Sequence, residues 1–179
     1  MHHNLKAILA TSLLFFSCQS VASGGCAFDD KQGGFMATCS AEKKEVIMTG
    51  AVTTEQLNKF DWFSQEYTDY VADEAIIAKL HAVTEATEIT VVIGTWCSDC
   101  HRETPRFVRI MEQINNPLVT VKFIGVDREK QDPQGLAANY DFTRIPTIIV
   151  EQNGSEIGRI VEKPTLTLEK DLAAILKAS

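Results

Sequence analysis

The sequence lacks the features that identify nucleic-acid-binding proteins, nucleotide-binding proteins and repeat proteins. Lysine and arginine total 17 against 24 aspartate and glutamate residues, which gives a formal net charge of −7, and no basic cluster interrupts this excess. Because an acidic chain is repelled by phosphate backbones, nucleic acid is not expected as a partner. The sequence has no glycine-rich phosphate loop, no internal repeat and no low-complexity tract, so we expect no organic cofactor.

Long hydrophobic runs are also absent. The most apolar stretch, Ala7–Phe16, has ten residues, too few to span a bilayer, and it follows a weakly positive start that contains Lys6. Small residues Ser20 and Ala22 then occupy the −3 and −1 positions of a cleavage site. The pattern predicts a signal peptide at residues 1–22 and a periplasmic or secreted protein.

A second interpretation of the same segment is a lipoprotein signal that ends before Cys18. In that case Phe15-Phe16-Ser17-Cys18 is the processing motif, and Cys18 carries the lipid. The two phenylalanines fit such a motif poorly. A membrane partner is expected only if Cys18 is lipidated.

Cysteine is sparse, with five residues, and either cleavage leaves four of them in the mature chain. An exported protein keeps its disulfides, so the even number predicts two bridges, one of them between Cys26 and Cys39 and the other between Cys97 and Cys100. Nothing electropositive or helical surrounds these two cysteines. We therefore expect a structural disulfide that closes a glycine-rich loop, and no second redox centre.

The segment Trp96-Cys97-Ser98-Asp99-Cys100 is the most informative part of the chain. It follows the apolar run Ile89–Ile93 and opens a segment that reads as a helix. A cysteine at a helix start meets unpaired N–H groups and the positive end of the helix dipole, both of which favour its thiolate. The thiolate is the species that attacks disulfides, so the spacing predicts thiol–disulfide exchange.

Several motifs in order resemble the thioredoxin family. Val91–Cys100 is similar to its active-site strand and turn, and Pro105 stands where the family carries a helix-kinking proline. Tyr140–Thr147 is similar to the approach to the family's cis-proline, and Asn153-Gly154 to its last hairpin turn. The resemblance covers Ile76 to Leu176, about one domain.

The resemblance and the alternation of β and α patterns imply an α/β, thioredoxin-like fold: a central mixed β-sheet flanked by helices, with a helical N-terminal extension. We expect a signal peptide at 1–22, an extension of loop plus helix at 23–72 and the thioredoxin-like domain at 73–179. The expected elements are helices at 54–71, 73–83, 97–114, 133–140 and 168–177, and strands at 45–49, 89–94, 119–126, 147–151 and 156–161.

The resemblance implies a role for each residue around the site. Cys97 is the nucleophile and Cys100 the resolving thiol, while Trp96 is a partly exposed apolar shelf. Pro146, if cis, holds Ile145 in an extended conformation that pairs with a substrate strand.

The dipeptide Ser98-Asp99 between the cysteines influences the reduction potential of the pair. Asp99, supported by Glu103, is expected to raise the pKa of the thiols and make the couple reducing. His101 either offsets these acids or is a solvated side chain.

The chain also departs from the family. A buried aspartate and its lysine partner are replaced by Val91 and Phe123, so both members of an ion pair are apolar together. Asp99 or water would then have to assist Cys100 as the base. Arg144 and the Glu162–Pro164 segment, which stands where the family has a glycine, predict a different substrate preference.

The leading interpretation is an exported disulfide reductase that acts on a protein or small-molecule disulfide and takes electrons from a thiol protein not yet identified. Alternatively, the same residues work as a disulfide oxidase or isomerase. Two further interpretations are a zinc site built with Cys26 and Cys39, and a binding module whose cysteines are vestigial. We expect no metal.

Overall fold

The computed structural model describes residues 45–178. The predicted signal peptide, Cys18 and the Cys26–Cys39 bridge lie outside these residues. None of the helices in the part of the chain described is both long and apolar enough to cross a membrane.

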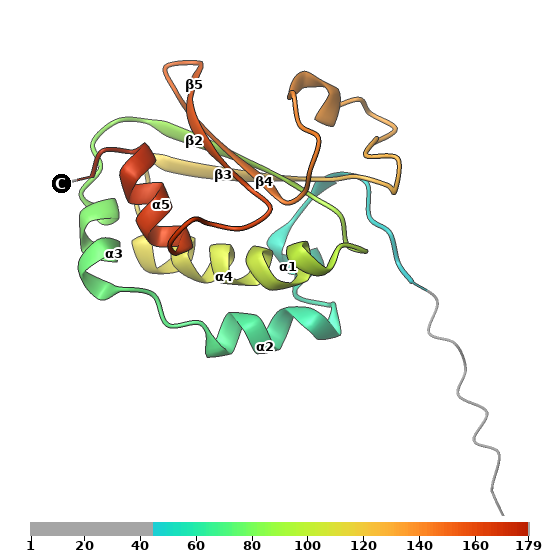
Figure 1. Cartoon of the computed structure of the whole chain (residues 1–179), viewed down its shortest axis with the longest axis horizontal. Helices are drawn as coiled ribbons and strands as arrows, with labels where there is room; N and C mark the ends of the chain where they lie inside the picture. Colours follow the sequence, from blue (N-terminus) through green and yellow to red (C-terminus); the bar gives the residue numbers. More distant parts are fainter. Residues whose placement is uncertain (1–44, 179) are drawn as a thin grey trace, which may run out of the picture. The chain divides into compact units, whose positions relative to one another are not determined.

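Five strands form one mixed sheet in the order β1-β3-β2-β4-β5 (Figure 1). The strands β2 and β3 run parallel, and every other neighbouring pair is antiparallel. The elements are β1 Gly50–Val52, α1 Thr54–Leu57, α2 Asp61–Asp69, α3 Glu74–His81, β2 Thr87–Ile93, α4 Ser98–Ile114, β3 Val119–Gly125, η1 Ala137–Asn139, β4 Thr147–Gln152, β5 Ser155–Val161 and α5 Leu168–Ile175. The predicted fold class is confirmed.

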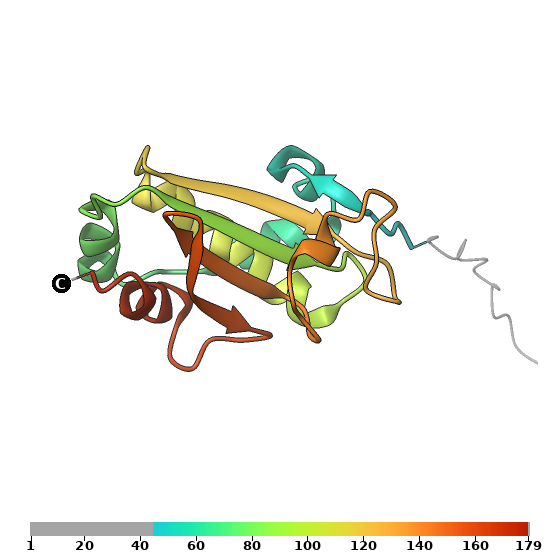
Figure 2. The same cartoon turned by 90° about the horizontal axis from the view of Figure 1, so that it is seen from above.

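Strand β2 lies at the centre of the sheet and is buried on both faces. Val91 is opposite Phe123 in the register, and Phe123 meets Phe107 of α4 edge to face, with ring centroids 6.2 Å apart. On the other face, the hydroxyl of Thr90 donates to that of Tyr140 at 3.0 Å. Helix α4 thus covers one face, and the connection that contains η1 lies over one end of the other face, as Figure 2 shows from above.

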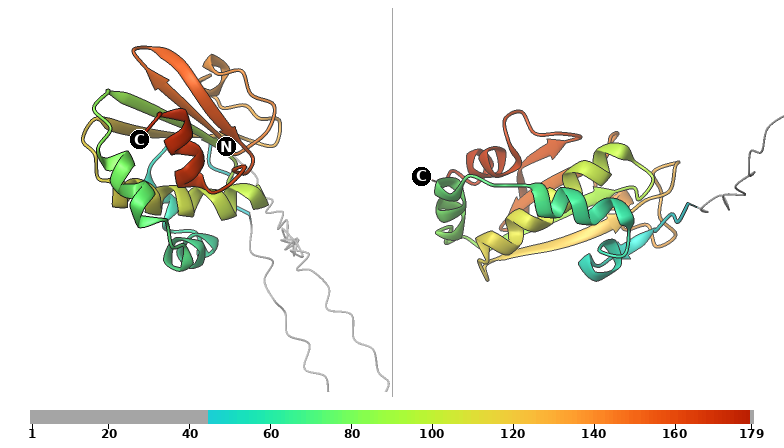
Figure 3. Two further views of the ribbon diagram at one scale, coloured as in Figure 1. Left: turned by 60° about the vertical axis from the view of Figure 1, so that its left-hand side comes forward. Right: turned by 90° about the horizontal axis from the view of Figure 1, so that it is seen from below.

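Helices α2, α3 and α5 pack against α4, with α2 on the side of α4 that faces away from the sheet (Figure 1). Helix α2 packs along α4, and α3 and α5 pack against each other and against the C-terminal half of α4 (Figure 3). Asp73 caps α3, since its carboxylate accepts from the backbone N–H groups of Ala75 and Ile76. At the other end of the chain, the hairpin predicted at Asn153-Gly154 is confirmed.

The single helix expected at 54–71 is wrong, because the chain forms two short helices with a break at Phe60. A capping box of Thr53 and Gln56 starts α1, and Phe60 is extended before α2. Leu57 and Phe63 are 0% and 2% exposed. Residues six apart point about 120° away from each other on one helix. The break lets both side chains enter the same core.

The helix expected at 133–140 is also wrong, and only the single turn η1 forms there. The carboxylate of Asp132 accepts hydrogen bonds from the backbone N–H groups of Gln134, Leu136 and Ala137. These contacts satisfy the donors without an α-helix. Gly135 in addition has a positive φ of 68°, which interrupts helical geometry.

The residues predicted as an extension contribute to this sheet. The register of β1 places Gly50 opposite Gly125 and Val52 opposite Phe123. The predicted boundaries at residues 22 and 72 stay predictions.

Candidate active site

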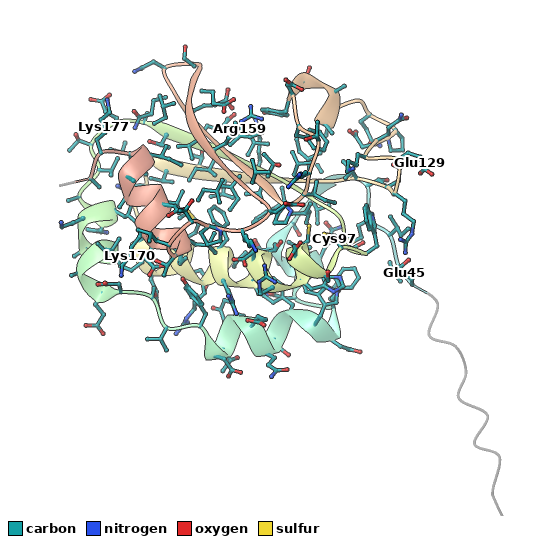
Figure 4. All side chains as sticks on the ribbon, viewed as in Figure 1. Glu45, Cys97, Glu129, Arg159, Lys170 and Lys177 are labelled. Atoms are coloured by element: carbon teal, nitrogen blue, oxygen red, sulfur yellow. The ribbon has the colours of Figure 1, made fainter. Side chains whose placement is uncertain are left out.

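The two cysteines lie where β2 ends and α4 begins. Cys97 is the extended residue before α4, and Cys100 is in its first turn. The backbone N–H of Cys97 donates to the carbonyl of Gly94 at 3.0 Å, which closes a tight turn between strand and helix. Figure 4 shows Cys97 at the end of the molecule where Glu45 and Glu129 also lie.

Cys97 faces the proline loop before β4. It is half-buried, and its Sγ lies 3.6 Å from the carbonyl oxygen of Ile145. The Ile145–Pro146 peptide bond is cis. Ile145 is 5% exposed, so its side chain belongs to the core and its backbone carbonyl faces the sulfur. The predicted nucleophile therefore lies directly beside the loop that carries the cis-proline.

The environment of Cys97 favours its thiolate. The pKa of Cys97 is lowered to about 6, chiefly by a hydrogen bond from the thiol of Cys100 and in addition by the backbone N–H groups of Cys100 and Asp99. Burial of the thiol and the negative charge of Asp99 act in the opposite direction. These N–H groups belong to the first turn of α4, where they have no partner within the helix. A thiol with this pKa is largely ionised at neutral pH.

We expect the alkylation rate of Cys97 by iodoacetamide to rise through a midpoint near pH 6, where the pKa lies. An unperturbed thiol has its midpoint near about pH 8.5. The pKa of Cys97 is lower in the folded protein than in the unfolded chain. The thiolate therefore stabilises the folded dithiol form at pH values above the unfolded pKa, and this stabilisation is lost as the pH falls through about 6. Mass spectrometry of the alkylated peptide gives the rate. A midpoint at or above 8 would contradict the assigned environment.

Cys100 has the opposite environment. It is 1% exposed, and burial raises the pKa of its thiol well above the usual range. The backbone N–H of Gly94 donates to its Sγ at 3.3 Å, a contact that favours the thiolate once it forms. Of the two thiols in the described part of the chain, Cys97 is therefore the one that a substrate sulfur can reach.

The prediction that acidic neighbours raise the pKa of Cys97 is wrong in its net direction. Asp99 does act that way, but it is partly exposed and forms an ion pair with Arg102 at 3.0 Å, so the hydrogen bonds outweigh it. Glu103 is 3% exposed and pairs with the Nε of Arg102 at 2.7 Å. Ser98 is exposed at the first position of α4.

Trp96 packs beside the turn, and its indole N–H donates to the carbonyl of Val126 at 3.0 Å. The guanidinium carbon of Arg128 lies 5.2 Å from the centroid of this ring, and Arg128 in turn pairs with Glu45 at 2.6 Å. A charged side chain thus covers part of the predicted apolar shelf.

His101 is not a solvated side chain. Its Nε2 lies 2.7 Å from the carbonyl oxygen of Thr95, and its ring stacks on Trp62. Trp62 was not expected at the site. The sequence gives no local signal for it, because Trp62 comes from α2, far from the cysteines along the chain, and reaches His101 only through tertiary packing.

The two positions of the family's buried ion pair are apolar and buried together. Val91 and Phe123 are 0% and 6% exposed and lie opposite each other. On the other side of Cys97, Arg144 pairs with Glu162 at 2.8 Å, and the N–H of Glu162 donates to the carbonyl of Pro146 at 2.7 Å. The loop that carries the cis-proline is therefore held by charged residues.

The spacing C-x-x-C-H, from Cys97 to His101, is also that of covalent haem attachment. Attachment requires both sulfurs to reach the haem and an imidazole nitrogen to reach the iron. Here Cys100 is buried, and Nε2 of His101 is bonded to Thr95. The geometry fits the redox pair and not a haem.

Within residues 45–178, no cluster of three or more His, Cys, Asp or Glu side chains has the geometry of a metal site. The zinc interpretation also needs Cys26 and Cys39. These two residues lie outside the described part of the chain, so that alternative stays untested.

Comparisons with known proteins agree with this geometry. A family model described as Thioredoxin matches residues 50–173, which run from β1 into α5. The chain is 30% identical over 78 residues to a thioredoxin-like protein of Acanthamoeba polyphaga mimivirus, a match that covers 44% of this chain and 54% of that protein. It is 37% identical over 68 residues to a thioredoxin of Echinococcus granulosus, with 38% and 58% covered.

The match spans just over half the length of each of these relatives. Among solved structures, a protein of unknown function from Pseudomonas aeruginosa is 20% identical, with a TM-score of 0.44 over 65% of this chain and 70% of that one. The family model covers well over half of the sequence and includes every strand of the sheet and both cysteines. The chain belongs to the thioredoxin family.

Proposed function

We propose that this protein reduces disulfide bonds through Cys97 and Cys100. The observation that carries the proposal is the contrast between the two thiols: a half-buried Cys97 with its pKa lowered to about 6, next to a buried Cys100. Nucleophile and resolving group are thereby distinguished within a single helical turn.

The reaction begins when the thiolate of Cys97 attacks one sulfur of the substrate disulfide. The substrate S–S bond breaks, a mixed disulfide with Cys97 forms, and the released substrate thiolate takes a proton. Cys100 then loses its proton and attacks the Sγ of Cys97, which releases the second substrate thiol. Two electrons and two protons pass to the substrate, and the Cys97–Cys100 pair becomes a disulfide.

The pKa of Cys97 supports reduction as the direction of exchange. Its value of about 6 is nearer to the value of about 7 for thioredoxin than to the value of about 3.5 for the strong oxidant DsbA. A less stabilised thiolate means a less stabilised dithiol form, which gives up electrons more readily. Oxidase or isomerase activity with the same residues is the alternative.

We further propose that the protein acts after export, as the pattern of residues 1–22 indicates. Its substrate would be a protein or small-molecule disulfide. Because exported compartments are oxidising, regeneration of the dithiol form then requires a thiol protein as electron donor. Lipid attachment at Cys18 would place the same activity at a membrane.

The test is the reduction potential of the Cys97–Cys100 pair, measured by equilibrating purified protein in glutathione or dithiothreitol buffers and counting alkylated thiols. A Cys26→Ala/Cys39→Ala variant isolates the pair. A reversible two-electron couple near about −270 mV supports the reductase. A value near about −120 mV would reverse the proposed direction, and the lack of any reversible couple would remove the proposal.

A further inference from the structure

The indole of Trp62 lies flat on the imidazole of His101. The ring centroids are 4.3 Å apart and the planes are inclined by 13°. Trp62 belongs to α2, whereas His101 immediately follows Cys100 in α4. This stack is therefore a direct contact between α2 and the helix that carries both cysteines.

The imidazole in turn contacts the turn before Cys97. Its Nε2 lies 2.7 Å from the carbonyl oxygen of Thr95. A carbonyl oxygen only accepts, so Nε2 carries the hydrogen and donates it. The nearly parallel indole stacked on the imidazole opposes rotation of the ring out of this hydrogen bond.

Thr95 is a point where several contacts meet. It is 3% exposed, and its hydroxyl accepts from the N–H of Met48 at 3.1 Å and donates to the carbonyl of Val46 at 2.8 Å. The backbone carbonyl of Thr95 is also hydrogen-bonded, to His101, so contacts fix both the side chain and the backbone of this residue. Two residues later, Cys97 has little freedom to move away from the N–H groups of α4.

We infer that Trp62 is a positioning residue for the reactive cysteine: by clamping His101 onto the carbonyl of Thr95, it keeps the sulfur of Cys97 over the first turn of α4. The inference rests on the proposed thiol–disulfide exchange. It assigns a part in that chemistry to α2, a helix that otherwise only packs along α4.

A competing explanation is that Trp62 merely fills space beside Phe60 and Phe63, whose ring centroids are 5.2 and 6.0 Å from its own. The indole N–H is buried and has no hydrogen-bond partner among residues 45–178, so a hydrogen bond does not explain the choice of tryptophan. If Trp62 only fills space, removing its ring lowers stability and leaves the alkylation rate and the oxidation equilibrium of the dithiol unchanged. If it positions Cys97, both of these quantities change in a protein that is still folded.

The experiment compares three single variants of the full-length protein with wild type. Trp62→Leu removes the stack, and Trp62→Phe keeps an aromatic face on His101. Tyr67→Leu is the matched control. It removes another aromatic ring of α2, which stacks on Phe63 and not on His101. Circular dichroism and thermal unfolding establish that each variant is folded.

The readouts are the rate of Cys97 alkylation at neutral pH and the equilibrium constant for oxidation by glutathione disulfide. We expect Trp62→Leu to slow alkylation about tenfold, because a sulfur that leaves the N–H groups of α4 regains a pKa near the ordinary value of about 8.5 and is then mostly protonated at neutral pH. Oxidation should become more favourable, since the dithiol form loses thiolate stabilisation. Trp62→Phe and Tyr67→Leu should stay within about twofold of wild type.

A double variant tests whether Trp62 acts through His101. If both side chains act through one hydrogen bond, Trp62→Leu/His101→Ala reacts no more slowly than His101→Ala alone. Additive losses would overturn the inference, as would a folded Trp62→Leu protein that reacts at the wild-type rate. If Trp62→Leu does not fold, His101→Ala decides, because unchanged alkylation there also overturns it. A wild-type protein without a reversible couple would refute the proposed function instead.

Discussion

Cys97→Ser should lower the rate of disulfide reduction by more than about 10³-fold, because it removes the nucleophile and leaves only the buried sulfur of the pair. Cys100 is 1% exposed and its thiol has a strongly raised pKa, so it cannot substitute. The rate is measured with a model protein disulfide as substrate. The assay contains an excess of a reductant that regenerates the Cys97–Cys100 dithiol but does not itself reduce the substrate within the assay time.

The resolving role predicts a different result for Cys100→Ser. Attack by Cys97 still occurs, but the mixed disulfide is not resolved and accumulates as a covalent adduct that mass spectrometry detects. The cysteine control is Cys26→Ala/Cys39→Ala, which should keep the wild-type rate if that pair is structural. If Cys97→Ser kept activity, or if the adduct formed on another cysteine, the assignment of the two roles would be wrong.

Val91→Asp should destabilise the protein by about 3–5 kcal/mol, because it places a carboxylate in the centre of the sheet without a partner. Val91 is 0% exposed, and Phe123, which lies opposite, offers no charge. The change in unfolding free energy is measured by urea denaturation. Because burial raises the pKa of such a carboxyl, the deficit should shrink as pH falls and the group becomes neutral.

Val91→Ala is the matched control, since it removes apolar volume at the same place without adding charge, at a cost of about 2 kcal/mol. Equal losses for the two variants would mean that the aspartate finds a partner or reaches water. That result would contradict the description of this position as an apolar replacement of the family's buried ion pair.

Local signals in the sequence were enough to place the two cysteines at the start of a helix and to locate the hairpin. Cys97 and Cys100 are identified by spacing and by the apolar run before them, and Asn153-Gly154 marks a tight turn by itself. Each of these depends on residues that are close together in the chain. The parallel arrangement of β2 and β3 follows from the helix between them.

Features that depend on three-dimensional geometry were not predicted. The break at Phe60 arises because two side chains must enter one core. The helix expected at 133–140 is replaced by local hydrogen bonds from the backbone to the Asp132 carboxylate, which compete with the helical pattern. The pKa of Cys97 depends on hydrogen bonds whose strength relative to the charge of Asp99 is set by three-dimensional geometry. The stack of Trp62 on His101 is of the same kind.

The protein contains two tryptophans, and both lie at the active site. Trp96 adjoins Cys97, and Trp62 is stacked on the imidazole that follows Cys100. Sulfur and imidazole both quench indole emission, so closing or opening the disulfide should change the intrinsic fluorescence without any label. Because no third indole adds a constant background, the entire signal comes from the neighbourhood of the dithiol, and the redox state can be followed optically in real time.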